Sequence, residues 1–217
     1  MRLSMARMTA PLLWVALLLP RPGTCADIEV TVHDPAGAPL ANVVVYADPE
    51  SGVTPTVTSG RATIDQVDRE FVPAVSVVRT GTDVYFPNSD NIRHSIYSFS
   101  APKVFTIRLY NGREAPPVRF DKPGLVVLGC NIHDMMVAWL VVVDTPWYGK
   151  TAADGRLTLH GLDAGLYKVH VWYPSDGFAP STDVVRLGEA GRERRHYVVD
   201  PADSPLPAVL ARIQKGH

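Results

Sequence analysis

Residues 124–143 read GLVVLGCNIHDMMVAWLVVV, two apolar runs on either side of a short polar loop. Both runs have strand length and are rich in β-branched residues, so they predict β-strands. The loop holds Cys130, His133 and Met136 at steps of three. A soft thiolate, an imidazole and a thioether are ligands that suit copper, provided that a second histidine arrives from elsewhere in the chain. This stretch therefore predicts a β-rich fold with a candidate metal site beside two strands.

His94 is placed to supply that histidine. It follows a polar turn and opens the expected strand Ser95–Ser98. The roughly 35 residues between His94 and Cys130 leave room for the strand crossings of a β-sandwich. Two imidazoles and a thiolate in one plane, with a distant thioether, suit copper in both oxidation states. The residues thus predict one copper site, and a hydrogen-bonded core histidine is the alternative for His94.

The first 26 residues have the layout of a secretory signal. Two arginines precede the apolar run Ala10–Leu19, and small residues lead to Ala26. We expect cleavage near Ala26, which removes Cys25 and leaves Cys130 as the one thiol of a periplasmic protein. Because exported proteins usually pair their cysteines, Cys130 is then a buried thiol, an intermolecular disulfide or a metal thiolate. A lipoprotein with an acylated Cys25 as its first residue is the alternative.

The composition limits what the chain binds. A formal net charge of -1 offers no field that attracts nucleic acid or anionic lipid. After the signal, no apolar run is long enough to span a bilayer. The 217 residues, with 19 prolines and 16 glycines, are enough for one large or two small β-rich domains.

Nearly all of the remaining chain reads as β-strand, which predicts an all-β fold. Strand-type segments alternate with turn signals such as Asp34-Pro35-Ala36-Gly37. The expected strands are residues 27–33, 42–47, 62–64, 74–79, 83–86, 95–98, 104–109, 118–120, 124–128 and 137–143. Only residues 207–215 show a helical stripe.

Several motifs together resemble the cupredoxins, the type 1 blue-copper domains. They are Phe71-Val72-Pro73, the segment Gly81 to Asp90, His94, and Cys130-x-x-His133-x-x-Met136 with the short loop of amicyanin. Asp65-Gln66, Tyr97 to Ser100 and Leu128 to His133 are similar to bacterial exported proteins of the methylamine-utilisation or plastocyanin-like type. The resemblance covers about residues 62 to 145. It implies a Greek-key β-sandwich with His94, Cys130 and His133 as equatorial copper ligands and Met136 as the axial one.

Two residues of the loop depart from the family pattern. Asp134 and Met135 stand where such short loops often have a proline and an aromatic residue. Asp134 could stabilise oxidised copper or be a solvated turn residue. Met135 is the rival axial ligand, although it would have to fold back to reach the metal. Around the site, Ser95 and Asn131 are expected to tie the two loops together, and Asn88 and Asp90 to cap their turn.

The flanks resemble a second kind of module. Residues 32–45 are similar to the opening of a carboxypeptidase regulatory-like sandwich of the transthyretin/Ig type, and residues 151–171 to its later half. Neither half has enough strands to hide its own face. The expected division is a signal peptide (1–26), the first part of this sandwich (27–60), the cupredoxin (61–145), the second part (146–200) and a C-terminal tail (201–217). A single extended barrel with a C-terminal cap is the alternative.

Two functional classes follow from these expectations. One is a periplasmic electron carrier that cycles between Cu(I) and Cu(II), with a cytochrome c or a periplasmic dehydrogenase as its redox partner. The other is a protein that binds or delivers copper, or a β-sandwich that serves only attachment. An enzyme is not expected, because Cys130 and His133 come with no third orienting group or oxyanion motif. The seven histidines also contain no His-x-His pair.

Overall fold

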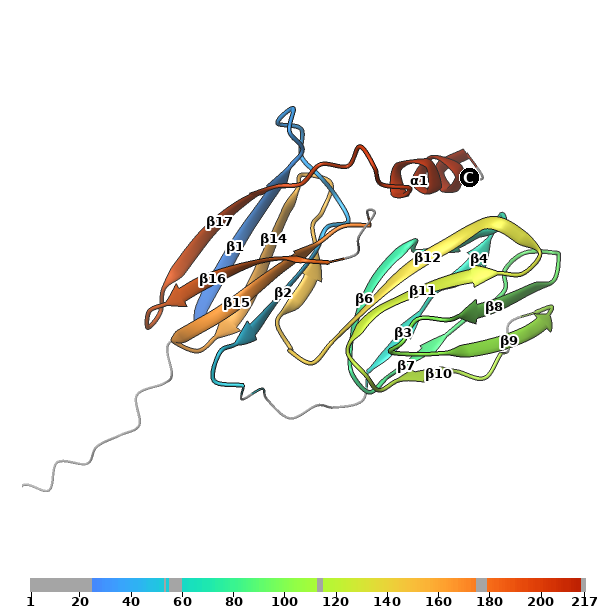
Figure 1. Cartoon of the computed structure of the whole chain (residues 1–217), viewed down its shortest axis with the longest axis horizontal. Helices are drawn as coiled ribbons and strands as arrows, with labels where there is room; N and C mark the ends of the chain where they lie inside the picture. Colours follow the sequence, from blue (N-terminus) through green and yellow to red (C-terminus); the bar gives the residue numbers. More distant parts are fainter. Residues whose placement is uncertain (1–24, 53, 55–59, 113–114, 175–178, 216–217) are drawn as a thin grey trace, which may run out of the picture.

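The computed structural model describes residues 25–52, 54, 60–112, 115–174 and 179–215. Nearly all regular structure in these ranges is β-strand, and the strands form two β-sandwiches side by side (Figure 1). This confirms the all-β fold class. Most of the expected signal peptide lies outside the described residues. Across the ranges that are described, no helix is long and apolar enough to cross a membrane.

One sandwich, here called the flanking sandwich, takes its strands from both ends of the chain. It consists of the sheets β14-β1-β17 and β13-β2-β15-β16. Its strands are β1 (Ala26–His33), β2 (Val44–Pro49), β13 (Tyr148–Lys150), β14 (Arg156–Leu162), β15 (Gly165–Trp172), β16 (Ser181–Leu187) and β17 (Arg192–Val198). Strand β1 alternates buried and half-buried residues along its whole length, as a strand with one face in a core does. It pairs in parallel with β17, whose Arg192 and Arg194 are exposed beside Glu29.

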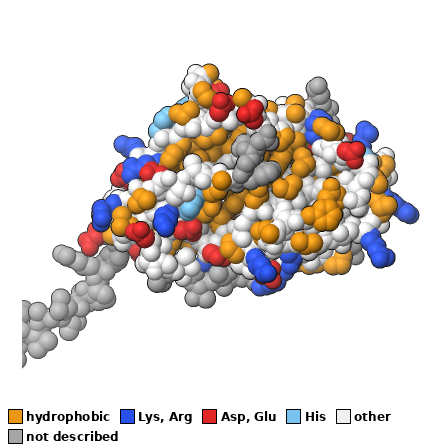
Figure 2. Space-filling model, in the orientation of Figure 1, with side chains coloured by type: hydrophobic (Ala, Val, Ile, Leu, Met, Phe, Trp, Pro, Cys, Tyr) orange, Lys and Arg blue, Asp and Glu red, His pale blue; other side chains and the backbone are white. Residues whose placement is uncertain are grey.

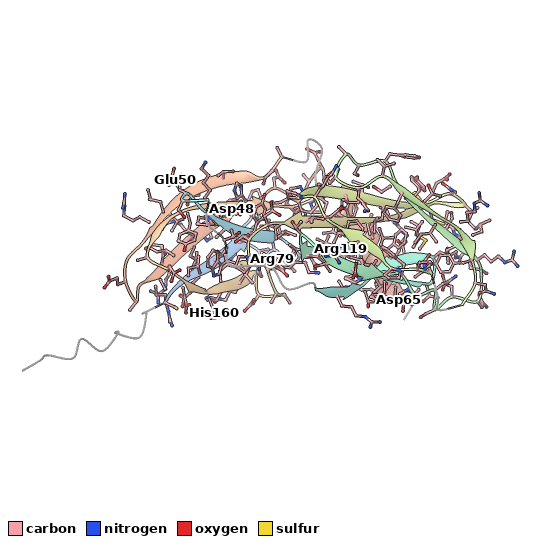
Figure 3. The ribbon with its side chains drawn as sticks, turned by 90° about the horizontal axis from the view of Figure 1, so that it is seen from below. Asp48, Glu50, Asp65, Arg79, Arg119 and His160 are labelled. Carbon is pink, nitrogen blue, oxygen red and sulfur yellow. The ribbon has the colours of Figure 1, made fainter. Side chains whose placement is uncertain are left out.

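The other sandwich, here called the central sandwich, is formed by the residues between β2 and β13. It consists of the sheets β10-β7-β3 and β6-β12-β11-β8-β9 and the hairpin β4-β5. Its strands are β3 (Arg61–Thr63), β4 (Asp65–Val67), β5 (Glu70–Val72), β6 (Val75–Arg79), β7 (Thr82–Tyr85), β8 (His94–Ser98), β9 (Phe105–Tyr110), β10 (Val118–Phe120), β11 (Gly124–Cys130) and β12 (His133–Val143). Figure 3 shows Asp65 and Arg119 on this sandwich, and Asp48, Glu50 and His160 on the flanking one.

Two features of the central sandwich differ from the sequence prediction. The hairpin β4-β5 was not expected, because its short strands bury the polar residues Gln66 and Glu70 and so lack an apolar alternation. Strand β12 begins at His133 rather than at Val137, because His133 pairs with Cys130 across the loop. The loop that carries the candidate ligands is therefore part of the sheet.

The apolar runs at residues 124–129 and 137–143 are each unbroken because their strands pack against a core on both faces. Along β12, the even-numbered side chains from Met136 to Val142 lie in the core of the central sandwich. The odd-numbered side chains from Trp139 to Val143 lie in a second core, which they share with the flanking sandwich. Strands with two buried faces read as unbroken apolar runs. The five-stranded sheet is thus the middle layer between its own partner sheet and the flanking sandwich.

Polar contacts and surface shape mark the junction of the two sandwiches. Lys150 on β13 donates a hydrogen bond from Nζ to the carbonyl of Val75 on β6, at 2.5 Å. Burial lowers the pKa of Lys150. A cleft of about 370 Å³ lies between Trp172 of the flanking sandwich and Val141 of the central one. Figure 2 shows hydrophobic side chains gathered over the middle of one face, where the sandwiches meet.

The expected helical stripe near the C-terminus forms the helix α1 (Leu206–Lys215). Leu206 and Val209 are buried in the shared core, and Leu210 and Ile213 pack against it. This spacing of three and four residues is that of one helix face. In Figure 1, α1 lies beside the end of the central sandwich that holds β4 and the start of β12. It also contacts β5.

Candidate metal centre

Three of the predicted ligands meet at one end of the central sandwich. Cys130 ends β11, His94 begins β8 and His133 begins β12. Nδ1 of His94 lies 3.8 Å from Sγ of Cys130, and Nδ1 of His133 lies 3.7 Å from the same sulfur. Within the part of the chain that is described, this is the one group of three His, Cys, Asp or Glu side chains whose ligand atoms could hold a metal ion. These atoms lie within 4.8 Å of one another.

The distances fit three ligands around one metal ion. Bonds of about 2.0–2.1 Å to imidazole nitrogen and about 2.3 Å to thiolate sulfur, at roughly 120°, place nitrogen and sulfur about 3.7–3.8 Å apart. The two Nδ1–Sγ separations in the structure are 3.8 and 3.7 Å. A tetrahedral angle would place the atoms about 3.6 Å apart. Both arrangements agree with these separations to within about 0.2 Å, so the three side chains could hold a metal ion.

Asp90 orients the buried ring of His94. Its Oδ2 lies 2.6 Å from Nε2 of His94, whose side chain is fully buried. Burial raises the pKa of Asp90, but hydrogen bonds from the backbone of Arg69 and from His94 outweigh burial and hold this pKa below its ordinary value. An ionised carboxylate only accepts hydrogen bonds, so Nε2 of His94 carries the proton. The lone pair of the neutral ring is then on Nδ1, the atom that faces Cys130.

The same carboxylate holds the tip of the hairpin β4-β5. The backbone N–H groups of Asp68 and Arg69 donate to its two oxygens, at 2.6 and 2.9 Å. Asp68 and Arg69 have positive φ angles of 52° and 63°, which residues other than glycine rarely adopt. Two such residues in succession are typical of a tight hairpin turn, and here the carboxylate satisfies the N–H groups that this turn exposes. Asp90 therefore joins a candidate ligand to a strained turn.

A second connection ties the two loops that carry the ligands. The backbone N–H of Asn131 donates to Oγ of Ser95 at 3.1 Å, as the sequence predicted. The same hydroxyl lies 3.9 Å from Sγ of Cys130. Ser95 and Cys130 are both 2% exposed, so this connection is shielded from water. A hydrogen bond in such surroundings resists exchange with solvent and keeps the loops in register.

His133 is the side of the cluster that is open to solvent. The side chain of His133 is half-buried, whereas that of His94 is fully buried. The two rings lie 4.8 Å apart, with an angle of 54° between their planes. Burial lowers the pKa of His133, and the neighbouring His94 lowers it further. A lowered pKa keeps the imidazole neutral near pH 7, the form that binds a metal.

The solved structures to which this chain is similar include several cupredoxins. The purple cupredoxin from Nitrosopumilus maritimus is 22% identical, with a TM-score of 0.34, over 37% of this chain and 98% of that one. A reduced amicyanin mutant is 17% identical, with a TM-score of 0.35, over 45% of this chain and 98% of that one. The copper-containing nitrite reductase from Thermus scotoductus is 25% identical, with a TM-score of 0.37. This match covers 52% of our chain but only 28% of the reductase.

Comparisons of sequence add no family to these structural similarities. No protein-family model matches the chain, and no curated protein matches it. Because the TM-scores are below 0.5, the similarities assign no function, and the case for a metal depends on the side chains of this chain. The expected likeness to methylamine-utilisation proteins and to carboxypeptidase regulatory-like modules stays a prediction.

The two methionines of the loop point in opposite directions. Met136 is 1% exposed and lies in the same core as Cys130, whereas Met135 is 65% exposed. The register between β11 and β12 explains this difference. Gly129 pairs with Val137 and Cys130 with His133, which leaves residues 134–136 without partners on β11. Such a bulge turns the strand locally and re-aims its side chains.

Sequence reasoning missed three residues around the cluster. Asp90 was expected only to cap a turn, and its position four residues before His94 was the one signal for a contact with that ring. Glu70 and Arg212 were not singled out at all. Arg212 on α1 pairs with Glu70 and also donates to the carbonyl of Met135. Contacts between segments this far apart in the chain leave no local pattern in the sequence.

Proposed function

We propose that this chain is a type 1 copper protein that carries single electrons in the periplasm. His94, Cys130 and His133 are the equatorial ligands in this proposal, and Met136 is the axial ligand. The observation that carries it is the pair of Nδ1–Sγ distances, 3.8 and 3.7 Å, around a buried cysteine. Two imidazoles and a thiolate in a plane with a weak thioether form a site that supports the Cu(I)/Cu(II) couple.

Burial supports Met136 as the axial ligand over Met135. A side chain that is 1% exposed and shares a core with Cys130 is available to an inward-facing metal, whereas one that is 65% exposed is not without a rearrangement of the loop. The bulge at residues 134–136 supplies the turn that Met136 needs. Met135 and Ile132, which is 50% exposed, instead form an apolar rim beside His133.

Burial of the ligands favours a carrier. His94 and Cys130 are almost fully buried, and each is tied to its surroundings by a hydrogen-bonding group, Asp90 and Ser95 respectively. A site held in this way changes little when the metal changes its charge, which is what rapid electron transfer needs. The half-exposed ring of His133 is the port for the electron, and a cytochrome c or a periplasmic dehydrogenase is the proposed partner.

One observation favours copper delivery as a second candidate. The thioether of Met135 is exposed beside His133, and soft thioethers bind Cu(I). A surface methionine next to a buried site is a route by which Cu(I) enters or leaves. Voltammetry and chelator competition separate the two functions, because a carrier gives a reversible couple and slow copper loss, and a delivery protein gives fast copper exchange.

Addition of Cu(II) to the purified protein tests the proposal. We expect one copper per chain and an intense visible absorption band from thiolate-to-copper charge transfer. Cys130→Ser should abolish this band. A folded wild-type protein that stays colourless with Cu(II) would show that the site is not of type 1.

We also propose that the flanking sandwich is one domain, split by insertion of the central sandwich. Its sheets combine β1 and β2 with β13 to β17, which supports this division. Removal of residues 60–143, with a short linker in their place, should leave a protein that unfolds cooperatively. Because Trp139 and Val141 belong to the shared core, we expect this protein to be less stable than the whole chain. An unfolded product would instead support a single extended barrel.

A further inference from the structure

The C-terminal helix reaches the loop between His133 and Met136. Nη2 of Arg212 on α1 donates a hydrogen bond to the carbonyl of Met135 at 2.9 Å, and its Nε pairs with the carboxylate of Glu70 on β5. These side chains, together with His133 and Met136, line one cleft of about 310 Å³ beside the metal cluster. A single guanidinium thus connects the helix, the hairpin β4-β5 and the ligand loop.

Apolar contacts hold the helix in place without help from Arg212. Leu206 and Val209 are buried in the shared core, with Leu210 and Ile213 packed against it. At its start, the N–H of Leu206 donates to Oγ of Ser204 at 3.2 Å, which caps the helix. Arg212 therefore projects from a support that its own substitution leaves largely intact.

Glu70 gives the guanidinium a fixed anchor. Its side chain is 5% exposed, and in the described ranges its Oε2 has no hydrogen-bond partner. A buried carboxylate is costly without a cation, so the pair with Arg212 is strongly favoured. Arginine has a planar fork of donors that can serve two acceptors at once, which the ammonium group of lysine cannot do in the same fixed geometry.

The carbonyl of Met135 belongs to the part of β12 that has no partner on β11. Residues 134–136 form the bulge between the pairs Cys130–His133 and Gly129–Val137. Backbone carbonyls outside a ladder need another donor or water. Arg212 supplies a donor at the point where the chain turns Met135 outward and Met136 inward.

We propose that Arg212 is a positioning residue that holds the bulge of the ligand loop, with Glu70 as its anchor, and so keeps Met136 directed at the metal. This inference rests on the proposed function for its effect on copper. It assigns the C-terminal helix a role at the metal site, although α1 contributes no ligand. Loss of Arg212 frees the carbonyl of Met135, loosens residues 134–136 and weakens the axial contact.

Amide hydrogen exchange and copper spectroscopy of Arg212→Ala and Arg212→Lys test this role. In the metal-free protein, we expect exchange at residues 135–137 to be about tenfold faster in Arg212→Ala than in the wild type. In the copper-loaded protein, we expect an altered electron paramagnetic resonance spectrum and about tenfold faster copper loss to a chelator. Arg212→Lys should resemble Arg212→Ala, because lysine keeps the charge but not the fork.

Arg119→Ala is the matched control, since it removes an arginine from an ion pair with Asp83 in the same sandwich, on β10. It should leave loop exchange and the copper spectrum unchanged. Arg212→Ala with wild-type exchange and spectrum would overturn the inference while the proposed function stands, and full rescue by Arg212→Lys would overturn the role of the Met135 contact. A wild-type protein without a copper–thiolate band would overturn the proposed function, and exchange in the metal-free protein would still decide whether Arg212 holds the loop.

Discussion

The two segments that carry the candidate ligands are held in different ways. His94 is fully buried, and its support comes from Asp90 and the hairpin β4-β5, all within the central sandwich. The loop from His133 to Met136 lies at the surface, and part of its support comes from Arg212 on α1. The His94 segment is held by residues of the central sandwich itself, and the loop from His133 to Met136 is held in part by the C-terminal helix.

Because of this difference, one side of the cluster is held rigidly and the other is accessible from solvent. The proposed redox site needs one side that excludes water and keeps the ligands still, and another that a partner protein can approach. The His94 side meets the first need, because the side chain of His94 is fully buried and that of Asp90, its hydrogen-bond partner, is 10% exposed. The His133 side meets the second need, because it is open to solvent. The hydrogen bond from Arg212 on α1 to the carbonyl of Met135 helps to hold this exposed loop in place.

The largest effect should come from the internal support. Asp90→Ala leaves Nε2 of His94 and the N–H groups of Asp68 and Arg69 without their acceptor. We expect the free energy of unfolding of the metal-free protein to fall by about 4 kcal/mol, measured by urea denaturation. Asp134→Ala removes an exposed carboxylate from the other loop and should change stability by less than about 0.5 kcal/mol. Equal losses for the two variants would contradict the difference between the loops.

The two methionines provide a comparison within the exposed loop. Met136→Ala leaves a cavity beside Cys130 and should cost about 3 kcal/mol in the metal-free protein, because this side chain is 1% exposed. Met135→Ala should cost less than about 0.5 kcal/mol, because this side chain is 65% exposed. With copper bound, only Met136→Ala should change the reduction potential strongly. A large change in Met135→Ala alone would show that Met135 is the axial ligand.

Gly129→Ala tests the contact between the two ligand segments. A Cβ at Gly129 would lie 2.6 Å from the ring of Tyr97, which follows His94 on β8. The contacting atoms are at the outer end of the Tyr97 side chain, which is half-buried and has to move aside, so we expect a loss of about 1 kcal/mol on urea unfolding. Gly188→Ala is the control, because its Cβ would meet no atom within 4 Å. If Gly129→Ala is as stable as Gly188→Ala, the two segments are not packed as tightly as the structure indicates.

The smallest effect concerns the attachment of the flanking sandwich. Burial lowers the pKa of Lys150, so between this lowered pKa and the ordinary value of 10.5 the unfolded chain binds more protons than the folded one. The stability contributed by Lys150 therefore rises as the pH rises through this window. We expect the free energy of unfolding of the wild type, measured by urea denaturation, to rise relative to that of Lys150→Met as the pH approaches 10.5. A pH-independent difference would mean that Lys150 is not buried at the junction.

Part of the fold could be read from the sequence because some signals are local. The alternation along β1 and the spacing of Leu206, Val209 and Ile213 in α1 each reflect one buried face, so periodicity alone predicts the element. The unbroken run of β12 predicts a strand, but not that its odd-numbered and even-numbered residues enter different cores. The hairpin β4-β5 has no such signal, because Gln66 and Glu70 are polar and buried.

The sequence by itself determined the chemistry that this protein can offer, through Cys130, His133 and Met136 at steps of three in one loop. The tertiary structure decided the rest: which nitrogen of His94 faces the sulfur, which methionine turns inward, and that Arg212 reaches the carbonyl of Met135 from 77 residues away. The physical reason is the separation along the chain of the residues that set each property. Ligand type and strand period are properties of neighbouring residues, whereas hydrogen bonds to Asp90 and Arg212 exist only once separate segments have packed together.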